Sequence, residues 1–368
     1  MELPIRANYL GTQGGQSRAP TRTGAAGLAG YIGIGMPLGE KKLIEQIRRR
    51  ARGGPSLVGG LAGGLVTGIG DDCAVLRVPA GHELLVTTDF TIENVHFRRD
   101  WHRPELVGRY CLTRGLSDIA AMGGEPRAAF LSLAVGDDVP QKWVDRFLKG
   151  LLALAHEFKI PLAGGDTAQS ADGTGIQADI VVVGSVPHGK AVLRSGAKPG
   201  QDIYVTGELG GAAATLARLA ESKPVGAKYS MSSTGHISRQ SPPQARVTVG
   251  QSLRRRGLAS AMIDLSDGLS TDLEHICQES RVGAEIEAEA IPRAQLGKKR
   301  VGLEFALHGG DDYELLFTSP AALPAQVAGV RVTRIGRTVK SAGMRLIGAD
   351  GKSTRLKAEG WEHFKGDL

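Results

Sequence analysis

The chain has 368 residues, 41% apolar and 23% charged, so it is long enough for two domains and is not globally disordered. Its net charge of +7 is scattered and only 5% of residues are aromatic, which argues against a nucleic-acid partner and suits an anionic small substrate. No apolar run is long enough to span a membrane, and the three cysteines lack metal-ligand or disulfide spacing, as expected for a cytoplasmic protein without a membrane partner.

The first 35 residues are rich in glycine, alanine and arginine and contain one acidic residue, Glu2. They contain too much glycine for the apolar core of a signal peptide, so we expect residues 1–35 to be a disordered N-terminal extension. Met36 stands directly before the first helical pattern and is an alternative start of the protein.

An α/β domain that binds ATP and metal is expected over residues 36–192. A first helix begins at Glu40 and ends near Gly53, and a second begins at Pro104 and stops at Gly123, since proline favours the first turn of a helix and glycine its end. The other expected elements are strands over residues 84–88, 128–135, 160–163 and 180–186 and a helix over residues 143–158.

A polar segment at residues 194–200 separates this unit from a second α/β domain, expected over residues 193–368. Residues 221–243 lack periodicity and are rich in Ser, Gly, Lys and Pro, which predicts a mobile loop. Asp350 and Gly351 predict a hairpin turn. The expected elements are strands over residues 202–206, 261–265 and 313–318, a β-rich stretch over 330–356, and helices beginning near residues 209, 245 and 269.

Five segments place aspartate beside glycine or another small residue at the edge of an apolar run. They are residues 70–72, 87–89, 164–167, 264–268 and 309–312. A sixth carboxylate, Asp118, lies near the end of the helix that starts at Pro104, where the helix dipole disfavours an anion and a nearby cation is expected.

Taken singly, each of these aspartates reads as an ordinary turn or cap residue. Asp264 or Asp267, for example, could simply cap the helix that begins at Leu269. As a set they indicate something else, because converging carboxylates repel one another and need cations to hold them together. The interpretation is therefore a site built from aspartates on several glycine-flanked loops.

Mg²⁺ is the cation that suits such a set, since it takes hard oxygen ligands and keeps substrate phosphates and water in its coordination shell. The sequence has no zinc-binding pattern and no EF-hand spacing. It also lacks a Walker A loop and the protein-kinase signatures, and residues 207–211 match a dinucleotide fingerprint only weakly. If the protein binds ATP, metal-bound phosphates would have to replace the usual glycine-rich loop that holds the phosphates. The set of acids therefore predicts a magnesium-dependent phosphotransferase.

At these segments the sequence closely resembles the thiamine-monophosphate kinases, of the aminoimidazole-ribonucleotide synthetase superfamily. The matching stretches occur in family order at residues 68–74, 87–89, 94–97, 116–123, 164–167, 194–200, 263–269 and 309–315. The resemblance implies a two-domain α/β (α+β) fold of the aminoimidazole-ribonucleotide-synthetase type, whose N-terminal domain pairs its sheet with that of a second copy in a homodimer. It also implies transfer of the γ-phosphoryl group of ATP to thiamine monophosphate, giving thiamine diphosphate and ADP.

The resemblance further implies a role for each matching residue. The implied ligands of several Mg²⁺ ions are Asp72, Thr87, Thr88, Asp89, Asp118, Asp166, Asp264 and Asp267, with Asp118 and Asp267 as the catalytic pair. The implied nucleotide contacts are Gly165, Asp166, Arg194 and Ser266. The implied contacts to the thiamine end are His96, Asp311 and Trp361, where the family commonly has tyrosine at the last position. Without the resemblance, His96 would read as a structural histidine and Arg194 as a surface arginine.

The acceptor is itself an anionic phosphate, so no general base is needed and we expect direct in-line transfer without a phospho-enzyme.

A selenophosphate synthetase should carry a reactive cysteine near its N-terminus, and residues 1–72 have none. A hydrogenase-maturation relative should have a cysteine in its C-terminal tail, whereas this chain ends at Leu368 without one. A purine-pathway synthetase stays open, although residues 94–97 favour the thiamine branch. A non-catalytic nucleotide- or metal-binding protein is disfavoured by the intact set of acids.

Overall fold

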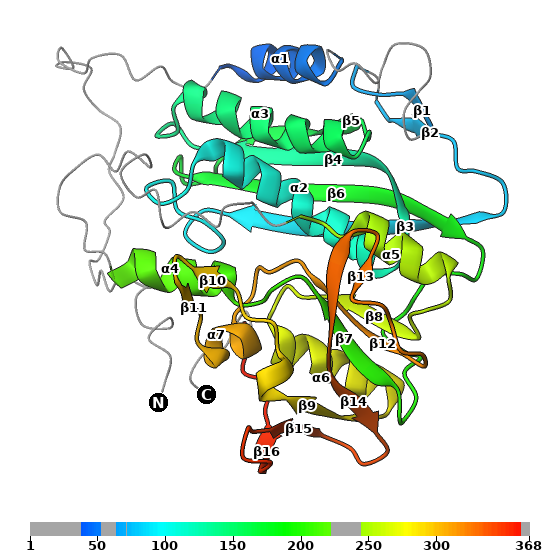
Figure 1. Ribbon diagram of the computed structural model, residues 1–368. Coiled ribbons are helices and arrows are strands. Elements are labelled where there is room, and N and C mark those ends of the chain that lie inside the picture. The colour runs from blue at the N-terminus through cyan, green and yellow to red at the C-terminus, as the bar shows by residue number, and fades with distance from the viewer. Residues whose placement is uncertain (1–37, 53–63, 71, 222–243, 362–368) are drawn as a thin grey trace.

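Residues 38–52, 64–70, 72–221 and 244–361 are described by the computed structural model, and Figure 1 shows how their helices and strands are arranged. The expected disordered extension at residues 1–35 and the alternative start at Met36 lie outside the described residues. So does the expected mobile loop, apart from Glu221, the last residue of a helix. No helix in the described segments is both long and apolar enough to cross a membrane.

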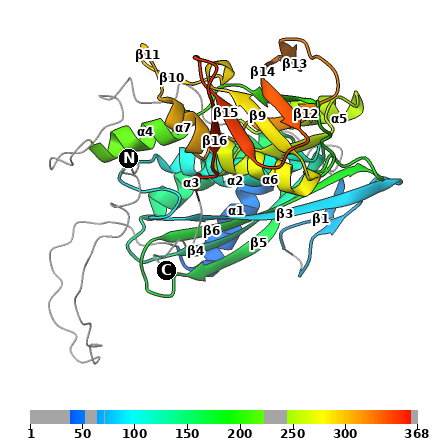
Figure 2. The ribbon, with the colours of Figure 1, turned by 90° about the horizontal axis from the view of Figure 1, so that it is seen from below.

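The first half of the chain builds a four-stranded sheet in the order β3-β6-β4-β5. Its strands are β3 (His82–Ile92), β4 (Glu125–Val135), β5 (Leu162–Gln169) and β6 (Ile176–Pro187). β4 and β5 run parallel, and the other neighbours are antiparallel. The helices of this half, α1 (Glu40–Arg52), α2 (Pro104–Ala121) and α3 (Gln141–Glu157), lie over one face of the sheet (Figures 1 and 2). We call the opposite face the outer face.

The alternation of side chains along β6 shows how the sequence sets these two faces. Ala178, Ile180 and Val182 are buried toward the helices, whereas Asp179 and Val181 between them are only half-buried on the outer face. Successive side chains of a strand point to opposite faces, so the buried set fixes the register of the whole sheet.

Helix α2 begins and ends where the sequence predicts. Pro104 occupies its first turn, and the chain leaves it at Gly123, whose φ of 67° is a left-handed conformation that glycine adopts readily. The helix packs very closely on α3. A Cβ atom at Gly108 would lie 2.0 Å from the carbonyl oxygen of Phe147, and one at Gly150 would lie 1.9 Å from that of Glu105. Glycine is therefore required at both positions for this contact.

The second half of the chain builds a larger sheet in the order β16-β15-β9-β14-β7-β12-β8, with β13 paired to β14. Its strands are β7 (Asp202–Thr206), β8 (Ala261–Asp264), β9 (Gly283–Glu287), β12 (Leu315–Ser319), β13 (Gln326–Val327), β14 (Val330–Val339), β15 (Met344–Ile347) and β16 (Ser353–Leu356). Its helices are α4 (Gly211–Glu221), α5 (Val247–Arg255), α6 (Leu269–Ser280) and α7 (Leu303–His308), with a short 3-10 turn at Ala288–Ala290. Two small hairpins pair β1 (Leu65–Thr67) with β2 (Val75–Leu76) and β10 (Gln295–Leu296) with β11 (Lys299–Arg300). The predicted hairpin turn at residues 350–351 is confirmed between β15 and β16.

Helix α2 also contacts the second half of the chain, so that it lies between the two sheets (Figure 2). A Cβ atom at Gly250 of α5 would lie 2.0 Å from the carbonyl oxygen of Ala120, and Arg254 Nε donates to the carbonyl oxygen of Gly123 at 2.7 Å. One buried apolar cluster includes Leu116 of α2 and Phe317 of β12. The division into domains at residues 192 and 193 stays a prediction, because this core runs through both halves.

The expectation that the aspartates lie on loops is wrong for several of them. Asp89 lies within β3 and Asp264 is the last residue of β8, whereas Asp118 lies near the end of α2, as expected. The strand expected to end at Ala163 continues through the Gly-Gly-Asp-Thr motif as β5. A Cβ atom at Gly165 would lie 1.8 Å from the carbonyl oxygen of the neighbouring strand, so the glycine permits close strand pairing where the sequence predicted a turn.

We predict that Gly108→Ala destabilises the protein by about 1–3 kcal/mol, because the added methyl group overpacks the contact between α2 and α3. A loss of stability on this substitution would be informative, because alanine in a helix interior is otherwise more stable than glycine by up to about 1 kcal/mol. Urea-induced unfolding measures the effect. Gly39→Ala is the control, as no atom lies within 4 Å of a Cβ at that position. Equal stability of the Gly108→Ala variant and the wild type would contradict the close packing.

Candidate functional site

Three carboxylates converge where α2 meets both sheets. Asp89 points inward from β3, Asp118 lies in the last turn of α2, and Asp264 ends β8 in the other half of the chain. Asp118 repels both of the others, which shows that the three charges are close together. We call Asp89, Asp118 and Asp264 the carboxylate cluster.

Burial and mutual repulsion make the charged form of this cluster unfavourable. Burial first, and repulsion from Asp118 second, raises the pKa of Asp89 to about 7. The same two causes raise the pKa of Asp264 to about 7, and burial raises the pKa of Asp118. Near neutral pH the cluster therefore holds protons that a cation would displace.

A few polar groups partly offset this repulsion. Thr87, two residues before Asp89 on the same face of β3, donates its hydroxyl to Asp118 Oδ2. The positive charge of Arg194 favours the ionised forms of Asp118 and Asp264, and that of Arg114 favours ionised Asp89. The structure thus places the charges of Arg194 and Arg114 near the cluster, and sequence reasoning missed Arg114.

The donor chemistry of the cluster fits a hard divalent cation. All three ligands are carboxylate oxygens, the type that Mg²⁺ prefers. Asp89 Oδ2 is buried and has no hydrogen-bond partner among the residues that the structure describes. A buried carboxylate oxygen without a donor is unfavourable unless a cation satisfies it. The residues present therefore fit magnesium.

Asp267 lies at the start of α6, beside a second acid that the sequence did not single out. The alternative that Asp264 or Asp267 caps α6 is wrong, because the N-cap position belongs to Gly268. The buried Asp272 instead accepts the backbone N–H groups of Asp267 at 3.2 Å and Gly268 at 3.0 Å. Burial raises the pKa of Asp272 well above its ordinary value. Asp272 therefore fixes the turn that presents Asp267.

Asp311 lies beside this turn, held by backbone and side-chain hydrogen bonds. Its N–H donates to the carbonyl oxygen of Ser266 at 2.9 Å. Arg114 Nη2 and the hydroxyl of Tyr313 both donate to Asp311 Oδ1, at 3.0 and 2.6 Å. Trp361 is brought to the same place, since its N–H donates to the carbonyl oxygen of Asp267 at 3.0 Å. Ser266, Asp267, Asp311 and Trp361 are therefore neighbours.

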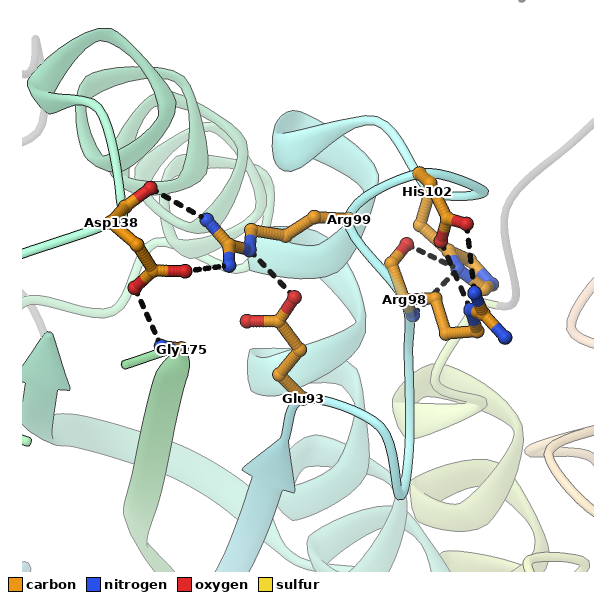
Figure 3. Close-up of polar contacts among 7 residues, drawn as sticks. Glu93, Arg98, Arg99, His102, Asp138 and Gly175 are labelled. Atoms are coloured by element: carbon orange, nitrogen blue, oxygen red, sulfur yellow. Dashed lines mark hydrogen bonds and ion pairs between the residues drawn. The ribbon is translucent and has the colours of Figure 1, made fainter. Parts of the chain in front are cut away.

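His96 lies on the segment between β3 and α2, which Figure 3 shows in part. Its Nδ1 accepts the N–H of Ile92 at 3.0 Å, so the ring orientation is fixed by its own turn. Arg99 anchors the segment by donating to Glu93 at 2.6 Å and to the side chain and carbonyl oxygen of Asp138 (Figure 3). The segment is thus tied to the end of the sheet.

The same segment approaches Asp311 through His102. Arg98 N–H donates to His102 Nδ1 at 3.2 Å, and Arg98 forms an ion pair with Asp100 at 2.9 Å (Figure 3). Burial lowers the pKa of His102, and the charge of Asp311 partly opposes that effect. His102 therefore lies within electrostatic reach of the Asp311 carboxylate.

Gly165 and Asp166 do not join the carboxylate cluster within one chain. The sheet register places Asp166 across from Ser132, Ser132 across from Asp179, and Asp179 across from Phe90 of β3. Three strand spacings separate Asp166 from β3, or about 14 Å. Its side chain also shares the outer face with Phe90, whereas Asp89 points to the inner face.

Thr88 likewise points away from the cluster in a single chain, and Asp72 follows a strand that packs on β5. Thr88 alternates with Asp89 along β3 and is exposed on the outer face. Asp72 is exposed and follows β1, whose Leu65 packs with Ala163 of β5. The predicted ligands other than Asp267 therefore fall into two groups, one at the carboxylate cluster and one on the outer face or near β5.

Known proteins match nearly all of the described chain. The family model for the N-terminal domain of AIR synthase related proteins matches residues 70–186, and the C-terminal model matches residues 198–348. A thiamine-monophosphate kinase of Salmonella typhimurium is 38% identical over 314 residues, which cover 81% of this chain and 92% of that protein. The chain belongs to the thiamine-monophosphate kinase family. A further family member, from Bacillus subtilis, is 36% identical and covers 81% of this chain and 93% of its own length.

Solved structures of the family agree with the fold. The thiamine-monophosphate kinase of Stenotrophomonas maltophilia has a TM-score of 0.70 and 34% identity, covering 85% of this chain and 96% of that one. AaThiL complexed with AMPPCP and TMP has a TM-score of 0.65 and 30% identity, covering 89% and 97%. The hydrogenase maturation protein HypE of Escherichia coli, at 18% identity and a TM-score of 0.66, shares the fold. The expected two-domain family fold is confirmed, whereas the pairing of two copies stays a prediction.

We predict that Asp264→Asn stabilises the metal-free protein at pH 8 by at least about 1 kcal/mol, the equivalent of roughly one pKa unit. The pKa of Asp264 rises from 3.8 to about 7 on folding, so the folded state binds more protons and its stability falls as pH rises through that window. The repulsion is fully present at pH 8 and largely absent at pH 5, where the gain should shrink.

Urea unfolding in EDTA at the two pH values measures this difference. The control is Asp350→Asn in an exposed turn, where the Lys352 N–H lowers the pKa of the aspartate instead, so no gain at pH 8 is expected. A gain from Asp264→Asn that is the same at both pH values would contradict the ionisation argument.

Proposed function

We propose that the protein is a thiamine-monophosphate kinase that transfers the γ-phosphoryl group of ATP directly to thiamine monophosphate, giving thiamine diphosphate and ADP. The observation that carries the proposal is the carboxylate cluster, formed by three different elements of a chain 38% identical to a kinase of that name. A family member complexed with AMPPCP and TMP supports both substrates. Two polyanions must be brought together for this reaction, and a site of buried acids is suited to that task through cations.

Several Mg²⁺ ions are proposed to bind at Asp72, Thr87, Thr88, Asp89, Asp118, Asp166, Asp264 and Asp267. When bound, they would neutralise the phosphate charges of donor and acceptor. Thr87 holds the carboxylate of Asp118 through its hydroxyl, and Asp272 holds the turn that carries Asp267. Asp118 and Asp267 are the proposed catalytic residues, because both are presented by contacts that fix their position.

The proposed substrate contacts form two sets. Gly165, Asp166, Arg194 and Ser266 are assigned to the nucleotide, and His96, Asp311 and Trp361 to the thiamine end. The closeness of Asp311, Trp361 and Ser266 supports a shared pocket for the two substrates. The fixed ring of His96 supports a role in positioning.

Two of the three cysteines are poorly suited to carry the phosphoryl group, whereas Cys73 is exposed. Burial raises the pKa of Cys111 and of Cys277 to about 12, so neither thiol supplies a nucleophilic thiolate at neutral pH. The acceptor phosphate is its own nucleophile, and the chain has only to align it. All three cysteines are free, which fits the cytoplasmic location that we propose.

We also propose that the enzyme is a homodimer whose outer sheet faces pack together. Leu84, Val86 and Phe90 of the edge strand β3 are 54%, 62% and 60% exposed on this face. Apolar side chains gathered on one strand face favour an interface. A two-fold axis would lay β5 of one copy beside β3 of the other, because these strands are opposite edges of the same sheet. Asp166 of the second copy would then lie beside the outer side of β3, the strand that carries Thr88 and Asp89.

Purified protein with ATP, Mg²⁺ and thiamine monophosphate is predicted to form thiamine diphosphate and ADP in equal amounts, as measured by chromatography. Asp118→Asn should lower kcat by about 10²–10³-fold or more, because a charge at the reacting phosphates is lost. Its unfolding temperature should not fall. Asp202→Asn, which breaks an ion pair with Arg334 and touches a long hydrogen bond from Tyr204, is the control. ATP turnover with an aminoimidazole precursor in place of thiamine monophosphate would refute the assignment.

Mixed dimers test the shared site. Asp118→Asn and Asp166→Asn chains with different tags are each expected to be inactive as homodimers. A purified dimer with one chain of each kind should have about half of the wild-type activity, because one of its two sites combines an intact Asp118 with the intact Asp166 of the other chain. An inactive mixed dimer would show that both residues act within the same chain.

A further inference from the structure

Arg114 is a buried arginine in α2 that the motifs leave without a role. It precedes Asp118 by four residues, so both side chains lie on the same face of the helix. Its side chain is only 15% exposed. A buried guanidinium needs anionic partners to be stable, and its partners therefore indicate what it does.

The partners of Arg114 belong to the other half of the chain. Its Nη2 atom lies 3.0 Å from Asp311 Oδ1, and its guanidinium carbon lies 5.7 Å from the ring centre of Tyr313. Tyr313 donates its own hydroxyl to the same oxygen of Asp311 at 2.6 Å. Two donors thus converge on one carboxylate oxygen, while the Asp311 side chain remains 36% exposed.

The backbone at Asp311 is strained, which indicates that its orientation matters. Asp311 has a φ of 64° and Tyr313 a φ of 52°, left-handed values that are uncommon outside glycine. Such residues persist when their surroundings hold them, and they gather at functional sites. Here the holding contacts are the N–H of Asp311 to Ser266 and that of Tyr313 to Leu265, each at 2.9 Å.

Arg114 also interacts with the carboxylate cluster on its other side. Its positive charge favours the ionised form of Asp89. The guanidinium therefore has one anionic neighbour in the proposed metal site and another in the proposed thiamine pocket. Only the contact to Asp311 is a direct ion pair within the described residues.

We propose that Arg114 is a positioning residue that holds the Asp311 carboxylate in the orientation that recognises the thiamine end of the acceptor, and so sets affinity for that substrate. The inference rests on the proposed function. Thiamine carries a positive ring and an aromatic amine, and both are complementary to a carboxylate with one oxygen fixed and the other available.

Kinetics of Arg114→Met and Arg114→Lys test the proposal. Arg114→Met removes the ion pair and keeps the length of the side chain, so it should raise KM for thiamine monophosphate about 10-fold or more, as expected for a charged hydrogen bond. Its kcat and its KM for ATP should change less than about 3-fold. Arg114→Lys keeps a charged donor and should recover most of the affinity.

Two controls distinguish a positioning role of Arg114 from a purely structural one. Arg109→Met removes an ion pair of the same helix, with Glu157 of α3, and should leave both KM values unchanged. In an Asp311→Asn background, Arg114→Met should raise KM for thiamine monophosphate little further, because the two residues act as one unit.

Other outcomes would overturn the inference. A fall in kcat at unchanged KM for thiamine monophosphate would place Arg114 at the reacting phosphates, and unchanged kinetics with a lower unfolding temperature would make it structural. If Arg114→Met does not fold, Arg114→Lys carries the test, because a KM for thiamine monophosphate raised about 10-fold or more despite the retained charged donor would contradict positioning through Asp311. If the wild type forms no thiamine diphosphate, the proposed function fails, and the inference fails with it.

Discussion

Repulsion among the buried carboxylates of Asp89, Asp118 and Asp264 is the constraint around which this fold is arranged. Each acid comes from a different element, so no local rearrangement can separate them without breaking a strand pairing or a helix contact. Helix α2 is held on both sides, by α3 at Gly108 and by α5 at Gly250. Packing energy therefore keeps the charges together until cations bind, and the affinity for those cations is raised by the repulsion that they relieve.

The chemistry of the site could be predicted from the sequence better than its geometry. Helix α2 was predictable because Pro104 and Gly123 are local signals for its two ends. The course of β5 was not, because the glycines of its motif are typical of a turn and only pairing with β4 shows that they belong to a strand. Asp272 and Arg114 were missed for a similar reason. Arg114 meets its partner across 197 positions of sequence, a separation at which periodicity gives no information.

The resemblance to the family assigned roles residue by residue, and the structure divides those residues in space. Asp118 and Asp264 share one buried region, whereas Asp166 lies on the outer face of the first sheet. Residues predicted to bind the same metal ions therefore need not lie close together within one chain. The proposed homodimer brings the two groups closer, since it lays Asp166 of one copy beside the strand of another copy that carries Thr88 and Asp89.

The exposed apolar stripe of Leu84, Val86 and Phe90 has a consequence for how the enzyme would behave on dilution. If the sites are shared between copies, a single protomer would be inactive. Its exposed strand would also tend to associate with the sheets of other molecules. Specific activity would then depend on enzyme concentration, falling once protomers separate. In a cell, a modest change in the amount of protein near that threshold would change the rate of product formation more than proportionally.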